Sequence, residues 1–310
     1  MNEYHKELEL GISLAKKAPK IPEWFKQKGF ISFEKKDHSP VTLADLATQS
    51  YIIYNLKKQF PQDLILAEEE SSIIDKDLEK IILECFDDLK IPIENPKEII
   101  NYRGNSSKRK WIIDPIDGTQ GYIEGLSYAI GIGFIDGSQP TISVISVPNY
   151  DERGLAIFYA ERGKGAKASY GKRPFNQIHV SDTQYLEEVR MCHSLHYDKP
   201  WVLDFARKMG INKFIRIDSM AKFCKVASGK ADLYIKPIDR DHSFIWDFLP
   251  GDLLVRESGG IVSDLTNNRL WFEGNILKWK SPGIIASNGI IHEKIIDNLK
   301  KLHISGDSFV

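Results

Sequence analysis

Residues 111–119 read Trp-Ile-Ile-Asp-Pro-Ile-Asp-Gly-Thr, and this stretch decides how the rest of the chain is interpreted. Its apolar start predicts the end of a buried strand, which delivers Asp114 and Asp117 to a turn stiffened by Pro115. Two carboxylates so close together suit hard cations such as Mg²⁺, which bind through oxygen. The amides that follow Gly118 are then free to face an anion such as phosphate. An Asx-rich turn that closes a strand explains the same residues, so other parts of the chain must decide.

Three further carboxylates, Asp45, Glu68 and Asp247, stand beside strongly apolar segments. Each has a simpler explanation when it is taken alone. Thr42 and Asp45 have the spacing of a helix capping box, Glu68 opens an acidic run of the kind that is usually solvated, and Asp247 complements a helix dipole. Together with the two aspartates of residues 111–119, they supply five carboxylates, enough for a site that holds several cations.

These residues give the chain a resemblance to the magnesium-dependent, lithium-sensitive phosphomonoesterases of the inositol monophosphatase superfamily, which includes fructose-1,6-bisphosphatase. The matching residues are Asp45, Glu68-Glu69, the run from Asp114 to Thr119, and Trp246-Asp247 with Gly251. The 23-residue gap between Asp45 and Glu68 is the spacing of that family. The resemblance extends from about Asp37 to Asn288, which is most of the chain.

The resemblance implies a layered α/β fold, an αβαβα five-layer sandwich with the metal site between its two halves. It also implies two or three Mg²⁺ ions as cofactors, with Li⁺, Na⁺ and Ca²⁺ as inhibitory ions. The implied metal ligands are Glu68, Asp114, the Ile116 carbonyl, Asp117 and Asp247. Asp114 is expected to bridge two ions.

The resemblance assigns activation of the attacking water to Asp45 and Thr119. A hydroxyl is a weak base alone, but a hydrogen bond to a carboxylate lets it orient and help to deprotonate a water molecule. Thr119 has a structural alternative as the N-cap of the helix that follows it. The two roles are compatible, so both stay open at this stage.

Within the superfamily, the chain is most similar to the 3′(2′),5′-bisphosphate nucleotidase branch. The segments that carry this likeness are 39–42, 120–122, 157–166 and 218–224. It implies removal of the 3′-phosphate from adenosine 3′,5′-bisphosphate, which yields AMP, and also from its sulfated form, PAPS. The alternatives are an inositol phosphatase with the same chemistry and a catalytically silent phosphate or nucleotide sensor. The branch differs from this chain at Gln120, and the loop 237–243 is shorter here.

Six residues are expected to contact the substrate. They are Gly118, Thr119, His193, Ser219, Lys222 and Lys236. Lys222 is expected to meet a phosphate, and Lys236, which matches a cationic position in the nucleotidase branch, to bind the second phosphate of a bisphosphate nucleotide. Such contacts, remote from the reacting ester, supply binding energy. Structural alternatives exist, since a serine before a helix often caps it, a lysine is often solvated, and a histidine is often only packed.

Composition limits the classes of protein. The net charge of −1 gives no electrostatic case for binding a nucleic-acid polymer or a membrane. Cys85, Cys192 and Cys224 form neither a metal-binding spacing nor an even disulfide set, which favours a reducing compartment. No apolar segment has the length of a signal core or a membrane span. We therefore expect a cytoplasmic monomer that acts on a small molecule.

The pattern along the chain predicts two domains, residues 1–180 and 181–310. Alternating apolar residues and turn signals predict an antiparallel meander over 127–160, and strands alternate with helices from residue 188 onward. The charged insertion at 72–110 is either a lid or a surface excursion. Glycines in the basic stretch 161–171 suggest a phosphate loop, but without the usual Gly-Lys-Ser/Thr ending a connector is the better interpretation.

Overall fold

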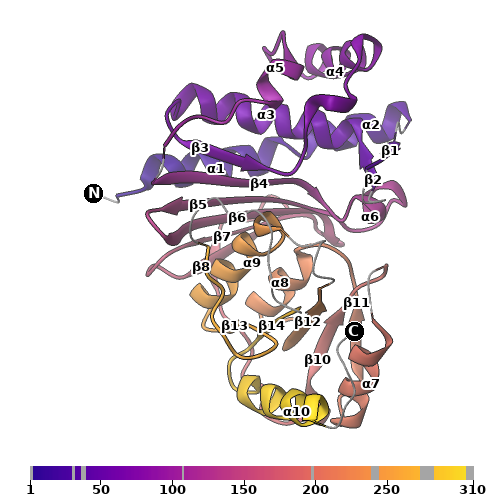
Figure 1. Cartoon of the computed structure of the whole chain (residues 1–310), viewed down its shortest axis with the longest axis vertical. Helices are drawn as coiled ribbons and strands as arrows, with labels where there is room; N and C mark the ends of the chain where they lie inside the picture. The colour runs from indigo at the N-terminus through magenta and orange to yellow at the C-terminus, as the bar shows by residue number, and fades with distance from the viewer. Residues whose placement is uncertain are drawn as a thin grey trace.

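In the computed structural model, the fold is a stack of five alternating helical and sheet layers (Figure 1), as the family resemblance implied. The structure describes residues 3–29, 32–35, 40–106, 108–196, 199–238, 244–272 and 283–304. Asp37, Ser39 and most of the loop 237–243, on which part of the resemblance rested, lie outside these residues. Among the described residues, no helix combines the length and apolar character needed to cross a membrane.

A seven-stranded sheet forms the second layer, in the order β3-β4-β5-β6-β7-β8-β9. Its strands are β3 (Leu64–Ala67), β4 (Arg109–Asp117), β5 (Ala129–Asp136), β6 (Gln139–Asp151), β7 (Gly154–Glu161), β8 (Ala166–Tyr170) and β9 (Asn176–Ile178). β3 runs parallel to β4, and every other neighbouring pair is antiparallel. The expected meander over 127–160 is confirmed, and it carries the central strands of this sheet.

Helices cover the outer face of the large sheet (Figure 1). They are α1 (His5–Lys17), α2 (Lys20–Lys28) and α3 (Leu43–Gln59), with the two-stranded ribbon of β1 (Ser32–Glu34) and β2 (Pro40–Thr42) beside them. The insertion adds η1 (Ser71–Ile73), α4 (Lys76–Asp88) and α5 (Pro96–Ile100). α4 and α5 pack on α3 and lie on the far side of it from the sheet. This position favours the surface excursion over the lid.

The second half of the chain supplies the other three layers. α8 (Ala221–Ala227) and α9 (Ile245–Glu257) lie between the two sheets. The five-stranded sheet has the order β11-β10-β12-β14-β13. Its strands are β10 (Arg190–His193), β11 (Lys213–Arg216), β12 (Leu233–Pro237), β13 (Ile261–Asp264) and β14 (Gly283–Ser287). α7 (Pro200–Lys208) and α10 (His292–Ile304) cover its outer face. The change of sheet between β9 and β10 agrees with the predicted division near residue 180, which remains an interpretation.

Two glycines of β5 let the middle helical layer approach the large sheet closely. A Cβ on Gly133 would lie 2.3 Å from Leu249 Cδ2 in α9, and one on Gly131 would lie 2.4 Å from Met220 Cε. Neither separation is sterically allowed, so a larger residue would push the layer away. Because α9 carries Asp247, a predicted site residue, these glycines also set how close this residue lies to the large sheet.

The glycine-rich turn between β7 and β8 is closed by a side chain from α9. Glu257 accepts hydrogen bonds from the amides of Gly163 at 2.8 Å and Gly165 at 2.9 Å. The amides that a phosphate loop would offer are therefore already occupied. This contact supports the interpretation as a connector and joins the large sheet to the middle layer.

A buried histidine joins the small sheet to α10. His292 is fully buried and lies between two serine hydroxyls, 2.9 Å from Ser263 Oγ through Nε2 and 2.9 Å from Ser287 Oγ through Nδ1. Burial lowers the pKa of His292 to about 4. The ring is thus neutral in the folded protein at neutral pH.

This arrangement predicts an acid-sensitive contribution to stability. The folded-state pKa of His292 lies below the usual 6.5, so its contribution is complete above pH 6.5 and falls as the pH drops toward 4. At pH 5 the loss is about 2 kcal/mol. Denaturant unfolding of the wild type and of His292→Gln at pH 7.5 and 5.0 should show a smaller pH dependence in the variant by that amount. Equal pH dependence in the two proteins contradicts the assignment.

Candidate functional site

The end of β4 forms the floor of the site, and its geometry differs from the expected turn. The strand does not stop at Ile113 but continues to Asp117, with an irregular register against β5 between Asp114 and Asp117. In a regular strand, residues three apart point to opposite faces. An inserted residue of the bulge type removes that alternation, and Pro115 suits the irregularity because it has no amide hydrogen to pair. Both aspartates consequently face the middle layer.

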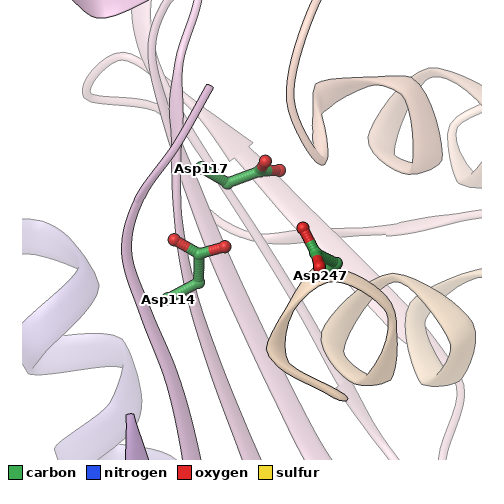
Figure 2. A group of neighbouring side chains, drawn as sticks. All are labelled: Asp114, Asp117 and Asp247. Carbon is green, nitrogen blue, oxygen red and sulfur yellow. The ribbon is translucent and has the colours of Figure 1, made fainter. Parts of the chain in front are cut away.

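Asp247 completes a group of three carboxylates. One oxygen each of Asp114, Asp117 and Asp247 lies within 4.8 Å of the other two. Figure 2 shows the first two side chains on β4 turned toward Asp247 at the start of α9. Asp247 is held there by its own helix, because its Oδ2 accepts the Phe244 amide at 2.9 Å. The dipole interpretation of Asp247 is therefore compatible with a place in the site.

The burial and the like charges of these three carboxylates favour the binding of cations. Asp114 is buried and its Oδ1 has no hydrogen-bond partner among the described residues. Burial, with Glu68 and Asp117 adding to it, raises the pKa of Asp114 well above its usual range. Burial and the charge of Asp247 raise the pKa of Asp117 to about 7. An unpaired buried carboxylate oxygen facing like charges fits hard divalent cations, which bind carboxylate and carbonyl oxygens. Ile116, whose carbonyl was an expected ligand, lines the same cavity.

Glu68 lies at the same cavity and is paired with a lysine that the sequence reasoning missed. Lys35 Nζ is 2.7 Å from Glu68 Oε1 and 2.6 Å from Glu69 Oε1. The solvated interpretation of the acidic run is wrong for Glu69, which is buried and exchanges two hydrogen bonds with Gln49. Burial alone would lower the pKa of Lys35, but Glu68 and Glu69 outweigh it and raise the pKa. Nothing in the pattern around Lys35, between two short strands, distinguishes it from a surface lysine.

Asp45 and Thr119 lie far apart in the sequence but are in contact in the fold. Thr119 Oγ1 donates a hydrogen bond to Asp45 Oδ1 at 3.1 Å and lies 3.0 Å from the Ile116 carbonyl. Asp45 is also the third residue of α3, and its Oδ2 accepts the Thr42 amide at 2.8 Å, so the capping box is real as well. Burial raises the pKa of Asp45 to about 6, although hydrogen bonds from Thr42 oppose the shift. The N-cap alternative for Thr119 is wrong, because Gly118 holds that position of α6 (Thr119–Ile123).

The cavity above these groups has a volume of about 540 Å³. The predicted site residues that line it are Glu68, Asp114, Ile116, Asp117, Gly118, Thr119, Ser219, Lys222, Lys236 and Asp247. Asp45 lies beneath it, fully buried. Lys236 Nζ is 3.6 Å from Asp247 Oδ1, and Lys222 Nζ donates to the Ile217 carbonyl at 3.3 Å. The structure thus brings eleven of the twelve predicted residues together.

Gly118 and Ser219 lie close together at the site, although they come from distant parts of the sequence. Both have left-handed backbone conformations, with φ of 85° and 67°. A Cβ on Gly118 would lie 3.1 Å from Ser219 Cβ. Glycine at 118 therefore satisfies both the backbone conformation and the contact.

His193 is the predicted residue that does not line the cavity. Its ring packs edge-on against Phe214 of the neighbouring strand, with centroids 5.9 Å apart. His196, three residues later, lines the cavity instead. It hydrogen-bonds Asp218 through Nδ1 and Glu124 through Nε2, the latter at 3.0 Å. The prediction placed His193 after a strand that ends at Cys192, but β10 extends through His193, and the loop that follows it carries His196 to the cavity.

Asp218 organises the segment around His196. Its Oδ1 accepts the Ser194 hydroxyl at 2.6 Å and the Leu195 amide at 2.7 Å. Burial opposes protonation of His196, but hydrogen bonds with Glu124 and Asp218 outweigh it and raise its pKa. This group therefore connects α6, the loop after β10 and the start of α8 along one rim of the cavity.

Comparison with known proteins identifies the family of this chain. The sequence profile of the inositol monophosphatase family matches residues 5–303. The chain belongs to the inositol monophosphatase family. Family members are metal-dependent, which agrees with the carboxylate cluster.

Curated relatives and solved structures agree with this membership. The chain is 30% identical to 3′(2′),5′-bisphosphate nucleotidase 1 of Candida albicans, over 97% of both chains. It is 31% identical to a 3′(2′),5′-bisphosphate nucleotidase of Schizosaccharomyces pombe, over 85% of this chain and 84% of the other. The fold is similar to that of an IMPase from Thermotoga maritima, with a TM-score of 0.72, 22% identity, and coverage of 97% of this chain and 99% of the other.

The hydrogen bond between Thr119 and Asp45 predicts separate effects on activity and folding. Thr119→Ala removes the hydroxyl that faces the cavity and should lower kcat by about 100-fold or more, the usual scale for a lost acid–base group. Thr119→Ser keeps the hydroxyl and should stay within about tenfold of the wild type. Turnover and circular dichroism should be measured together on both variants. Wild-type turnover in folded Thr119→Ala rules out the role.

The ion pairs of Lys35 with Glu68 and Glu69 predict that divalent ions affect the free energy of unfolding. In the absence of divalent ions, Lys35→Met leaves Glu68 and Glu69 without their cation and should cost about 1–3 kcal/mol of unfolding free energy. Mg²⁺ should restore more stability to this variant than to the wild type. Lys28→Met, which breaks an exposed pair with Glu84, is the matched control. Denaturant unfolding in EDTA and in Mg²⁺ tests this, and equal behaviour of the two variants refutes it.

Proposed function

We propose that this protein hydrolyses the 3′-phosphate of adenosine 3′,5′-bisphosphate to give AMP and phosphate, and that it acts in the same way on PAPS. The observation that carries the proposal is the pairing of Thr119 with Asp45 beside a three-carboxylate cluster, in a cavity of nucleotide size. The nucleotidase names of the curated relatives support the choice of substrate.

The cluster fits Mg²⁺ held by Glu68, Asp114, the Ile116 carbonyl, Asp117 and Asp247. When bound, such ions neutralise charge on the phosphoryl and leaving oxygens and acidify a water molecule. We propose two or three ions and inhibition by Li⁺, Na⁺ and Ca²⁺, as expected from the resemblance.

The proposed work of Thr119 and Asp45 is to position the attacking water. Thr119 donates its hydrogen to Asp45 Oδ1, which leaves the lone pairs of Oγ1 toward the cavity. A water molecule that donates to Oγ1 is oriented for attack and passes its proton toward Asp45. Since burial raises the pKa of Asp45 to about 6, this carboxylate is a stronger base than an exposed aspartate.

Aromatic side chains form part of the cavity wall, which suits a nucleotide more than a bare sugar phosphate. They are Phe223, Tyr234, Phe244 and Trp246, and the Phe244 and Trp246 rings are stacked 4.8 Å apart. Lys222 and Lys236 line the same cavity; Lys222 is proposed to meet a phosphate, and Lys236, 3.6 Å from Asp247, the second phosphate. An inositol phosphate has no base to place against aromatic side chains.

Two alternatives make different demands on the site. An inositol phosphatase uses the same metal chemistry but has no need of the aromatic wall. A silent sensor has no need of the hydrogen bond between Thr119 and Asp45. The aromatic residues favour a nucleotidase over an inositol phosphatase, and this hydrogen bond favours a catalyst over a sensor.

A substrate panel in Mg²⁺ tests the proposal. We expect kcat/KM for adenosine 3′,5′-bisphosphate to exceed that for inositol 1-phosphate by about 100-fold or more, since each charge-assisted contact to the second phosphate is worth about 1.5–3 kcal/mol. Adenosine 3′-phosphate, which lacks the 5′-phosphate, should fall between them. Chelation of divalent ions should abolish phosphate release from all three. Preference for inositol 1-phosphate supports the first alternative, and no release from any ester supports the second.

A further inference from the structure

A group of cations and tyrosines lies outside the catalytic cavity, where the β6–β7 turn, the end of β8 and the end of α8 meet. We call it the tyrosine–cation cluster. Its members are Tyr150, Arg153, Tyr170, Lys225 and Lys230. None of them lines the catalytic cavity, and the proposed reaction uses none of them.

The two tyrosine rings form a floor on which the cations lie. The ring centroids of Tyr150 and Tyr170 are 5.9 Å apart. Lys225 Nζ is 4.1 Å from the Tyr150 centroid, Arg153 Cζ is 4.0 Å from the Tyr170 centroid, and Lys230 Nζ is 5.2 Å and 5.0 Å from the two. Tyr150 is 5% exposed, and the Lys230 and Arg153 side chains are 38% and 26% exposed. The positive groups are thus gathered in one partly buried place instead of extending separately into water.

The cluster has more positive charge than its acidic neighbours balance. Asp151 is the shared partner of two cations, accepting a hydrogen bond from Arg153 Nε at 2.9 Å and lying 3.3 Å from Lys230 Nζ. Lys225 forms no ion pair with a carboxylate within the described part of the chain. Glu152 adds one exposed negative charge, and the turn after Tyr170 adds two exposed positive charges, at positions 172 and 173.

Two local effects offset only part of the positive charge of the cluster. The end of α8 offers a partial negative charge of about one half, and each cation–π contact contributes about 0.5–2 kcal/mol. Neither effect cancels the repulsion between Lys225 and Lys230. Burial is the larger cause that lowers the pKa of Lys225, and the nearby charge of Lys230 lowers it further. A bound anion would remove this repulsion.

We propose that the tyrosine–cation cluster is a second anion site, which takes a small tetrahedral oxyanion, a phosphate or sulfate group. Lysine ammonium groups act as point charges and suit such a group without a fixed hydrogen-bonding plane. The tyrosine faces are already covered by cations, so the site offers no stacking surface to a nucleobase. Free phosphate, free sulfate and the phosphoryl group of a nucleotide share the recognised chemistry.

Titration with inorganic phosphate in EDTA, at constant ionic strength, isolates this site, because the metal-free catalytic carboxylates repel an anion. At ten times its Kd, phosphate should raise the folding equilibrium constant of the wild type about 11-fold, which is about 2 °C in Tm. The double variant Lys225→Met, Lys230→Met should show no rise. Lys57→Met is the matched control, since Lys57 also lies over a single tyrosine, 4.7 Å from the Tyr102 centroid, and it should respond like the wild type.

A second measurement does not depend on the variants folding. Wild-type crystals grown without sulfate or phosphate and soaked in selenate should show an anomalous peak between Lys225 and Lys230. Sulfate, phosphate and AMP should raise Tm equally if the oxyanion alone is recognised, whereas a larger effect of AMP that the double variant abolishes indicates a nucleotide as the natural occupant. No peak, or an undiminished phosphate response in the double variant, overturns the proposal. Because no turnover is measured, this outcome is independent of the proposed hydrolase activity.

Discussion

Asp114, Asp117 and Asp247 bring one carboxylate oxygen each to within 4.8 Å of the other two, so their negative charges repel one another. Lys236 approaches one of the three, and Asp114 Oδ1 has no hydrogen-bond partner in the described part of the chain. Such a group is unfavourable in a buried place unless cations join it. The rest of the structure must therefore hold these side chains together against their mutual repulsion.

The first turns of two helices hold two of the site's carboxylates in place. Asp45 and Asp247 each occupy the third position of a helix, α3 and α9, and each accepts a backbone amide three residues earlier, at Thr42 and at Phe244. This bond satisfies an otherwise unpaired amide of the helix, and the dipole of the helix favours negative charge at this end. The same contacts that begin the two helices thus also fix the direction of two carboxylates of the predicted site.

Close packing between layers sets the remaining distances. α9 lies against β5 where Gly133 leaves room for Leu249, and Gly118 leaves room for Ser219 where the two halves of the site meet. Core residues pack on both faces of the middle helical layer. A shift of this layer would separate Asp247 from β4, so the site depends on small residues that take no part in chemistry.

The sequence by itself indicated the layered α/β class through its alternating strands and helices, and the resemblance carried by the Asp-Pro-Ile-Asp-Gly-Thr run supplied most of the predicted site residues. The capping box at Asp45 follows from the spacing of Thr42 and Asp45, and the meander follows from alternating apolar residues and turn signals along neighbouring strands. Tertiary structure alone decided the rest. Lys35 reaches Glu68 and Glu69 only because a short ribbon packs beside α3, and His196 instead of His193 lines the cavity because of where β10 ends. Ion pairs between distant segments and strand ends depend on packing across layers, which local spacing does not encode.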